Sequence, residues 1–402
     1  MSSISYIAVH GGAGIHGVNS EKDIKHALRK ACTEGLMMSS QSISTGFVTV
    51  PVSEGSAGVA ASAEHTHSDP RPSARASLDM VERAIVVLED DGHLNAGYGS
   101  NLTMDGVVEC DAAIMSARDG GLFGSSQIIW HDEGVKNPIR LARSILDYSC
   151  IPNKFGRVPP LTLTSSGAHK FASGKVETVP PETLIAPFAH EQWKKWKARL
   201  ESLEQALEAR NKQEMGISDI QDTVGAVAFD PAGGMAAGVS SGGLLLKWSG
   251  RVGEVFSTNA NVGSDFWSWV LGESSNGMQR TGEHIIREHI ARRLGDLYDN
   301  LEADPHEILD IVLRDYWDTV QKRGENAPSI GVLLLASDRE SVIRLWCGFT
   351  TASMAIGYAT NTKSTPKASV FLDHAVILRH PTANTRREDG KSQIYITSIP
   401  LA

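Results

Sequence analysis

Apolar residues recur at every third or fourth position in several stretches of the chain, and this spacing predicts amphipathic helices. The helices predicted in this way span residues 24–32, 78–88, 138–146, 193–209, 283–301 and 305–323. Short apolar runs bounded by turn residues predict buried strands instead. These runs span residues 4–9, 107–115, 223–229, 235–240, 330–336 and 342–346. Strands and helices that follow one another in groups predict a layered α/β or α+β domain.

Two segments interrupt this pattern. Residues 39–77 are rich in serine and contain the sequence Asp69-Pro-Arg-Pro72, which predicts a flexible surface insertion between two helices. Residues 180–220 are highly charged, and their end at 211–219 is polar and predicted to be mobile. The run at 194–199 has the composition of a nuclear localisation signal, but it also fits the solvated face of a helix.

Composition excludes several classes of protein. The chain has 402 residues, 41% of them hydrophobic, and a formal charge of −9, so its size suits a large core. The acidic balance argues against a nucleic-acid partner, and no apolar stretch reaches the length of a membrane helix. The start of the sequence lacks the pattern of a secretory signal, and the four cysteines are widely scattered. We therefore expect free thiols and a cytoplasmic or nuclear location.

Two glycine motifs match known sites by letter but not by context. Gly12-x-Gly14-x-x-Gly17 follows a strand like a dinucleotide fingerprint, yet the next helix is predicted to begin near Ser20, so the glycines do not open it. Gly238-Val-Ser240-Ser-Gly242 resembles the nucleophile elbow of serine hydrolases. Such an elbow passes directly into a helix, whereas the apolar run 244–246 follows here. Both motifs are better interpreted as tight turns.

A metal site has little support, whereas one threonine offers chemistry. His284 and His289 are five residues apart on a predicted helix, although a zinc pair needs four to share one face. Thr223 opens a buried strand directly after a polar segment. Cleavage of the Asp222–Thr223 bond would give Thr223 a free α-amino group that can act as the base for its own hydroxyl. By spacing alone, an ordinary threonine at the start of a strand is the better explanation of the pattern.

Several further motifs carry a family resemblance. The sequence resembles the asparaginase-2/taspase family, in matching order, over nearly its whole length outside 39–77 and parts of 180–220. The matching motifs are His10-Gly-Gly-Ala-Gly14, Asn95-Ala-Gly-Tyr-Gly-Ser-Asn101, Glu109-Cys-Asp-Ala-Ala-Ile-Met115, Lys136-Asn-Pro138, Asp222-Thr-Val-Gly-Ala-Val227, Ser240-Ser-Gly-Gly243, Gly250-Arg-Val-Gly253 and Thr350-Thr-Ala-Ser-Met-Ala-Ile-Gly-Tyr358.

The resemblance implies an α+β fold, a four-layer αββα sandwich of the N-terminal nucleophile hydrolase type. It also implies a precursor that cuts itself between Asp222 and Thr223. The products would be an α fragment, 1–222, with the insertion 39–77 and the mobile segment 180–222, and a β fragment, 223–402. Together they would form one catalytic domain, an αβ heterodimer that can pair into (αβ)2. The resemblance implies no cofactor and no metal in the active site, although relatives bind an alkali ion through the backbone loop that corresponds to 88–95.

The resemblance also implies roles for catalytic residues. Thr223 matches the nucleophile and base of the family. Ser241 matches a second hydroxyl that hydrogen-bonds the nucleophile, a position at which many members have threonine. Asn95 matches an asparagine that contacts the amino group of the nucleophile. These three residues form the predicted catalytic group.

A second set of residues would bind substrate. Arg251 matches an arginine that grips the substrate carboxylate, a task suited to a bidentate guanidinium. Glu254 stands where asparaginases carry an aspartate that binds the substrate α-ammonium. Thr281 and Gly282 lie in the segment that lines the oxyanion hole. That segment, Gln279-Arg-Thr-Gly-Glu283, departs from the family pattern because Gln279 and Arg280 replace a hydroxyl and a glycine.

The substrate divides the family. Three features favour a taspase-like endopeptidase that cuts after aspartate: the aromatic residue and Ser-Asn-Leu in the block 95–102, the long charged helix at 193–210, and the crowding expected from Glu254, Gln279 and Arg280. The alternative is a plant-type L-asparaginase and β-aspartyl peptidase, for which the acidic Glu254 is suited. The substrate is accordingly a protein or a small aspartyl or asparaginyl compound. A second alternative is an uncleaved pseudoenzyme that acts as a binding module.

Overall fold

The described part of the chain covers most of its length. A computed structural model describes residues 4–17, 20–39, 75–117, 123–128, 133–207, 223–253, 266–271, 281–300, 303–324, 328–337, 342–365, 368–380 and 394–401. No helix in these ranges is long and apolar enough to cross a bilayer.

Alternating apolar side chains build two large sheets from these segments. The first sheet has the strand order β13-β12-β1-β7-β8-β2-β3-β5. Its strands in chain order are β1 (Tyr6–Gly14), β2 (Cys110–Ser116), β3 (Phe123–Ile128), β5 (Thr162–Thr164), β7 (Val224–Asp230), β8 (Gly234–Ser241), β12 (Ser353–Thr365) and β13 (Ala368–Arg379). Neighbours are antiparallel except for β3 and β5.

The second sheet contains four antiparallel strands in the order β14-β11-β10-β9. They are β9 (Phe266–Leu271), β10 (Gly331–Ser337), β11 (Ile343–Phe349) and β14 (Tyr395–Pro400). The pairing of β10 with β11 confirms the hairpin predicted from the two apolar runs at 330–336 and 342–346. A small pair, β4 (Gly134–Val135) and β6 (Thr178–Val179), lies apart from both sheets.

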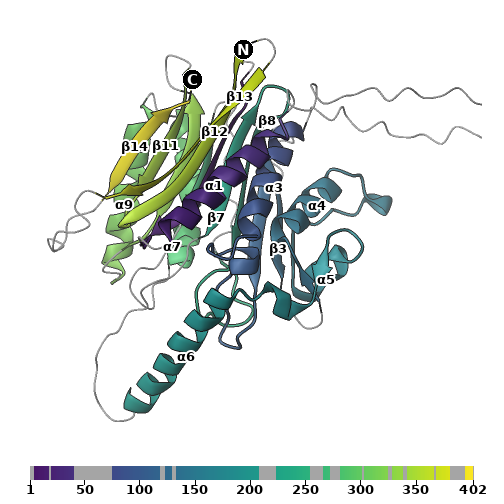
Figure 1. Cartoon of the computed structure of the whole chain (residues 1–402), viewed down its shortest axis with the longest axis vertical. Coiled ribbons are helices and arrows are strands. Elements are labelled where there is room, and N and C mark those ends of the chain that lie inside the picture. Colours follow the sequence, from purple (N-terminus) through teal and green to yellow (C-terminus); the bar gives the residue numbers. More distant parts are fainter. Residues whose placement is uncertain are drawn as a thin grey trace, which may run out of the picture.

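Helices pack on the sheets (Figure 1). The α-helices are α1 (Glu21–Leu36), α3 (Ala76–Glu89), α4 (Pro138–Ser149), α5 (Ser165–Ala172), α6 (Pro187–Leu207), α7 (Thr281–Glu288), α8 (Ile290–Asn300) and α9 (Pro305–Lys322). The 3-10 turns are η2 (Gly97–Gly99), η3 (Lys154–Gly156) and η4 (Pro181–Leu184). Helix α6 extends away from the sheets, at the bottom of Figure 1.

The described residues form four hydrophobic clusters, and three of them join the two large sheets to each other and to their helices. In one, Leu28 of α1 and Ile85 of α3 pack with Val9 of β1. In the second, residues from the opposite face of β1 and from β10 and β11 meet between the sheets. In the third, Leu294 of α8 and Leu313 of α9 pack on the second sheet. Because successive residues of a strand point to opposite faces, β1 serves two of these cores. Helices packed with two antiparallel sheets confirm the predicted α+β class.

The structure corrects four sequence-based predictions. The glycine-rich stretch 10–14 is not a turn but part of β1, which has an irregularity between His10 and Ala13 where Gly12 has a φ of 96°. The predicted helix 283–301 is two helices, because His289 has a φ of 48°. The helix expected at 193–209 begins six residues earlier, at Pro187. The insertion predicted at 39–77 ends sooner, because α3 begins at Ala76; residues 40–74 lie outside the described part of the chain.

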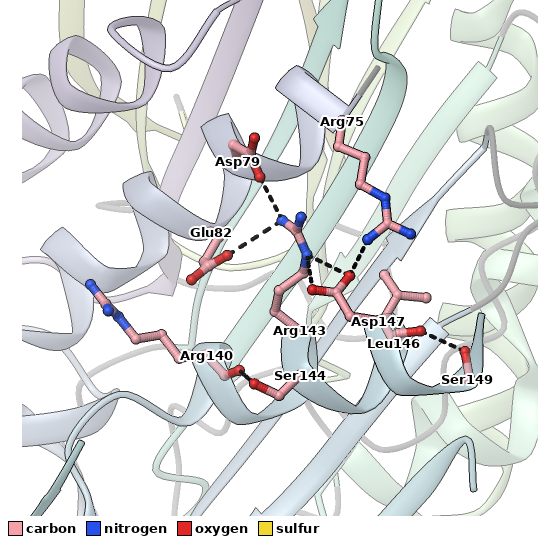
Figure 2. Close-up of polar contacts among 9 residues, drawn as sticks. All are labelled: Arg75, Asp79, Glu82, Arg140, Arg143, Ser144, Leu146, Asp147 and Ser149. Carbon is pink, nitrogen blue, oxygen red and sulfur yellow. Dashed lines mark hydrogen bonds and ion pairs between the residues drawn. The ribbon is translucent and has the colours of Figure 1, made fainter. Parts of the chain in front are cut away.

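A network of charges joins α3 to α4. Figure 2 shows the guanidinium of Arg143 among three carboxylates: Nη1 lies 2.9 Å from Asp79 and 3.3 Å from Glu82, and Nε donates to Asp147 at 3.0 Å. Arg75, at the start of α3, also pairs with Asp147. Burial raises the pKa of Asp79 and of Glu82, and the nearby Arg143 opposes that rise. The arginine is therefore the group that allows these carboxylates to be charged between the two helices.

Replacement of Arg143 by alanine should destabilise the chain by about 2–3 kcal/mol. This is slightly less than the typical cost of breaking a fully buried pair, because the three carboxylates are partly exposed. Urea unfolding measures the effect. Arg140→Ala, an exposed arginine on the same helix, is the matched control and should change the unfolding free energy by less than about 0.5 kcal/mol. Equal losses in the two variants would contradict the role assigned to Arg143.

Candidate active site

The register of two neighbouring strands brings two hydroxyl groups together in the interior. Strands β7 and β8 are antiparallel, with Val224 opposite Ser240. Thr223, directly before β7, therefore lies beside Ser241 at the end of β8, and their hydroxyl oxygens are 2.8 Å apart. Both residues are buried. The structure thus forms the hydroxyl pair expected from the sequence.

The turn after β8 is fixed by a dense set of hydrogen bonds. The Gly243 amide donates to the Ser241 hydroxyl at 2.9 Å. The side-chain amides of Asn95 and Asn101 both donate to the Gly243 carbonyl at 2.9 Å. The Gly242 amide in turn donates to the Asn95 carbonyl at 2.9 Å. Asn95 thus lies at the site but holds the turn; its predicted contact with the amino group of Thr223 stays a prediction.

Glycine is required in this turn because the backbone passes too close to its neighbours for a side chain. A Cβ on Gly242 would lie 2.3 Å from the Asn95 Oδ1 atom and 2.8 Å from the backbone of Ser100. Gly243 has a φ of 62°, which L-residues rarely adopt. The motif Ser240-Ser-Gly-Gly243 is therefore a compact turn. The serine-hydrolase elbow is excluded, because β8 is followed by this turn and not by a helix.

A neutral histidine packs behind Thr223. The ring of His10 in β1 lies against Gly225, where an added Cβ would be 2.3 Å from its Nε2 atom. Burial lowers the pKa of His10 to about 3, although hydrogen bonding to the backbone of Thr223 opposes the shift. His10 is consequently uncharged at neutral pH, so it adds packing without adding charge beside Thr223.

Arg251 is held by a carboxylate from the start of α7. Its Nε and Nη2 atoms donate to the two carboxylate oxygens of Glu283, each at 2.8 Å. The hydrogen bonds from Arg251 lower the pKa of Glu283. The remaining nitrogen, Nη1, lies beside Gly243 and Gly253, at 3.3 and 3.8 Å from ideal Cβ positions on those glycines. The predicted carboxylate-binding arginine therefore lies next to the turn that holds Ser241, with one side of its guanidinium already paired.

A buried lysine lies under the same turn. The ammonium of Lys247 donates to the carbonyl oxygens of Gly242, of Glu109 at 2.7 Å and of Asn101 at 3.5 Å. The Glu109 carboxylate accepts from the Gly250 amide at 2.8 Å, and Asp111 accepts from the Gly253 amide at 2.7 Å. The loop that carries Lys247 and Arg251 is thereby attached to β2 and the residue before it.

A buried carboxyl group lies at the end of α3, close to the loop that leads to Asn95. One oxygen of Glu89 accepts a hydrogen bond from the Ile139 amide at 2.9 Å, in the first turn of α4. A Cβ on Gly97 would lie 2.7 Å from the Glu89 Cβ. Burial raises the pKa of Glu89 to about 8. The protonation state of this group is therefore coupled to the packing of the Asn95 loop.

The remaining predicted site residues are only partly placed. Asp222 and Glu254 lie outside the described residues, as does most of the segment 254–280. Thr281 and Gly282 open α7, directly before Glu283. His284 is buried in α7 and His289 lies at the break between α7 and α8, so the pair does not share one helix face. In the described ranges no group of three or more His, Cys, Asp or Glu residues could hold a metal ion.

Three residues that the sequence analysis left out are central to this geometry: Lys247, Glu283 and His10. Lys247 directly follows the apolar run 244–246, and this position is the only local signal of its burial. The spacing of apolar residues does not distinguish a buried lysine there from an exposed one. Glu283 matched the family pattern but was given no role. His10 stood in a quoted motif whose strand was taken for a turn. In each case the function depends on contacts between segments far apart in the sequence.

Two antiparallel sheets and a threonine that opens a buried strand beside a second hydroxyl together define the class of N-terminal nucleophile hydrolases. Comparison with known proteins supports this class. The family model described as asparaginase, Asparaginase_2, matches residues 71–365. The chain therefore belongs to the asparaginase-2 family.

Relatives with established names are similar over about half of the chain. The plant-type L-asparaginase of Pyrococcus horikoshii is 37% identical over 227 residues, which cover 55% of this chain and 66% of the relative. The isoaspartyl peptidase/L-asparaginase of Bos taurus is 33% identical over 217 residues, which cover 54% of this chain and 61% of the relative. The matched region thus spans less than two thirds of each relative.

Replacement of Gly242 by alanine should disrupt the turn at the active site, because its Cβ would collide with Asn95 and with the Ser100 backbone. We expect the variant to lose about 2 kcal/mol or more of stability and to displace Ser241 from Thr223. Thermal unfolding and the rate of chain cleavage measure both effects. Gly167→Ala is the matched control, since nothing lies within 4 Å of its Cβ position. A Gly242→Ala variant indistinguishable from this control would show that the turn is not tightly packed.

Glu89 should make the chain less stable as the pH rises. Its pKa is about 8 in the folded chain against an ordinary value of 4.5, so its contribution is complete below pH 4.5 and is lost as the pH rises through 8. Relative to Glu89→Gln, the wild type should lose on the order of 4 kcal/mol between pH 5 and pH 8.5, both read by urea unfolding in a Thr223→Ala background. Parallel stability curves for the two proteins would mean that Glu89 is ionised in the folded chain.

Proposed function

We propose that this chain cleaves itself before Thr223 and then uses Thr223 to hydrolyse the side-chain amide of L-asparagine and the β-aspartyl bond of isoaspartyl dipeptides. The observation that carries the proposal is the buried pair of Thr223 and Ser241, 2.8 Å apart at the start of β7. The named relatives, plant-type L-asparaginases and isoaspartyl peptidase/L-asparaginases, favour this substrate class over the endopeptidase predicted from the sequence.

The proposed self-cleavage uses the Thr223 hydroxyl and the peptide bond that precedes it. The hydroxyl oxygen of Thr223 attacks the carbonyl carbon of Asp222, and the peptide nitrogen of Thr223 leaves as its α-amino group. Water then hydrolyses the resulting ester. The products are fragments of 222 and 180 residues. An α-amino group has an ordinary pKa of about 7.7–8.0, so it can accept the hydroxyl proton in later reactions.

In the proposed turnover, the Thr223 hydroxyl gives its proton to its own α-amino group and attacks the side-chain carbonyl of the substrate. Ammonia or an amino acid leaves, and water hydrolyses the aspartyl ester on Thr223. Arg251, which lies beside the turn that holds Ser241, is proposed to bind the substrate carboxylate. Glu254 is proposed to bind the substrate α-ammonium, and the segment that begins at Thr281 and Gly282 to stabilise the oxyanion.

The same proposal extends to the architecture. One hydrophobic cluster packs helices on the first sheet, one lies between the two sheets, and one packs helices on the second sheet. These contacts support a four-layer αββα sandwich in which the two fragments form one catalytic domain. The fragments would remain together as an αβ heterodimer that can pair further, because β1 of the first lies between β7 and β12 of the second. The alkali ion expected at loop 88–95 stays a prediction. In this loop the carbonyl oxygens of Leu88, Asp91 and Leu94 each accept a backbone hydrogen bond.

A second candidate function is the endopeptidase that cuts after aspartate. It is favoured by Trp248, three residues before Arg251, whose surface is 78% exposed. A large exposed aromatic side chain three residues from the proposed carboxylate-binding arginine offers contact area to a peptide chain, which a free amino acid would not use. Helix α6 also projects from the body of the molecule (Figure 1).

The proposed function predicts two results with purified protein. Intact-mass analysis after incubation should give fragments that begin at Met1 and Thr223, and Thr223→Ala should stay whole. The cleaved protein should release ammonia from L-asparagine and split a β-aspartyl dipeptide. Arg251→Lys should raise the Michaelis constant by roughly tenfold or more, because one ammonium cannot replace the guanidinium that both Glu283 and substrate contact.

Other outcomes separate the alternatives. Cleavage of internal Asp–X bonds in a peptide library, without ammonia release from asparagine, would overturn the proposal in favour of the endopeptidase. A wild-type chain that stays whole and turns over neither substrate would indicate a binding module. Ammonia release by Thr223→Ala would exclude Thr223 as the nucleophile.

A further inference from the structure

We propose that the Lys247 ammonium is a positioning group for the nucleophile, acting on Thr223 through the Gly242–Gly243 peptide and the Ser241 hydroxyl. This inference rests on the proposed role of Thr223 and adds a residue that the family resemblance and the comparisons leave without a role. It concerns a chain of hydrogen bonds that begins at a buried charge and ends at the nucleophilic oxygen.

The chain of contacts passes through a single peptide group. Lys247 donates to the carbonyl oxygen of Gly242, and the amide of Gly243 donates to the Ser241 hydroxyl at 2.9 Å. That carbonyl and that amide belong to the same peptide unit. A cation on the oxygen of a peptide draws electron density from it and makes its N–H a stronger donor. Lys247 therefore strengthens the hydrogen bond that Ser241 accepts.

The three carbonyl acceptors around Lys247 require the charged form of its side chain. An ammonium has three N–H donors, and the carbonyls of Gly242, Glu109 and Asn101 take all three. A neutral amine would leave one of these buried oxygens without its donor. Burial lowers the pKa of Lys247, whereas the charges of Asp111 and Glu109 raise it. The acceptors and these two carboxylates favour a cation at neutral pH.

The proposal assigns a direction to the last hydrogen bond. The Gly243 amide occupies one of the two lone pairs of the Ser241 oxygen, and the Ser241 proton is proposed to point to the Thr223 oxygen 2.8 Å away. A Thr223 oxygen that accepts a hydrogen bond loses its proton more readily, and after cleavage that proton would pass to the α-amino group. The next peptide group is held by Asn95 and Asn101, which both donate to the Gly243 carbonyl.

A double-mutant cycle tests whether Lys247 acts through Ser241. The rates of self-cleavage and of asparagine hydrolysis are measured for wild type, Lys247→Met, Ser241→Ala and the double variant. Lys247→Met should slow both reactions roughly tenfold or more in the wild-type background and by less than about threefold in the Ser241→Ala background. Equal losses in both backgrounds would overturn the proposal, because they would indicate a merely structural lysine.

The pH profile supplies a readout that a structural role would not move. Removal of a cation near the α-amino group raises the pKa of that amine, so the acid limb of kcat/KM should move to higher pH in Lys247→Met. The other charged or titratable groups around the turn, which stay in place, are Arg251, Glu283, Glu109, Asp111, Cys110 and His10. An unshifted acid limb would contradict the proposal.

Two controls keep the test decisive. Lys197→Met removes another lysine that donates to a backbone carbonyl, that of Met104 at 3.3 Å, and should leave both rates unchanged. If Lys247→Met does not fold, the 15N resonance of the Lys247 side chain in wild type gives the answer: a protonated, slowly exchanging ammonium at neutral pH is expected, and a neutral amine would overturn the proposal. A wild-type chain that never cleaves would count against the proposed function, whereas active wild type without coupling would count against Lys247 alone.

Discussion

The antiparallel register of β7 and β8 is the constraint on which the rest of the site depends. It places Thr223 beside Ser241 inside the protein, where polar groups without partners are costly. A buried hydroxyl pair therefore needs a polar surround, and the chain supplies it from distant segments. The turn at Gly242 and Gly243 provides the nearest donors, and the loop at Asn95 holds that turn in place. The fold itself therefore holds the two hydroxyl groups in place.

The basic groups around this hydroxyl pair differ in charge and in burial. His10 is neutral, Lys247 is buried beneath the turn, and Arg251 lies at the edge of the turn and pairs with Glu283. Each cation has acidic or carbonyl partners, which reduces the cost of burial. Both cations lie around the turn that holds Ser241 beside Thr223.

Much of the fold could be predicted from the sequence, because local patterns decide it. The 3.6-residue spacing of apolar side chains predicted α3 and α9 nearly to their ends and the middle of α1, and the apolar runs predicted β7, β8, β10 and β11. The failures have physical reasons. Gly12 with its φ of 96° lets β1 continue through a stretch that reads as a turn. At His289 the helical spacing of apolar residues continues although the helix is interrupted, so the sequence pattern predicts one helix where the structure has two.

The proximity of Thr223 and Ser241 in the candidate site was predictable from the family resemblance, and the roles given to them and to Arg251 stay predictions. The contacts of the site were not predictable where they join segments far apart in the sequence. Nothing local indicates that Lys247 donates to carbonyls 138 and 146 residues earlier in the chain. In the same way, only the structure pairs Arg251 with Glu283, 32 residues later. Such pairings are properties of the folded chain and leave no periodic trace in the sequence.

The most direct test of the account is to trap the acyl group on its nucleophile. Processed protein is mixed with saturating L-asparagine, quenched in acid within milliseconds to seconds, and digested for mass spectrometry. The account predicts that the β fragment gains the mass of one aspartyl group, carried by the peptide that begins at Thr223, and that Thr223→Ala gains none. An aspartyl group on any other residue, or asparagine turnover without an adduct at any quench time, would contradict it.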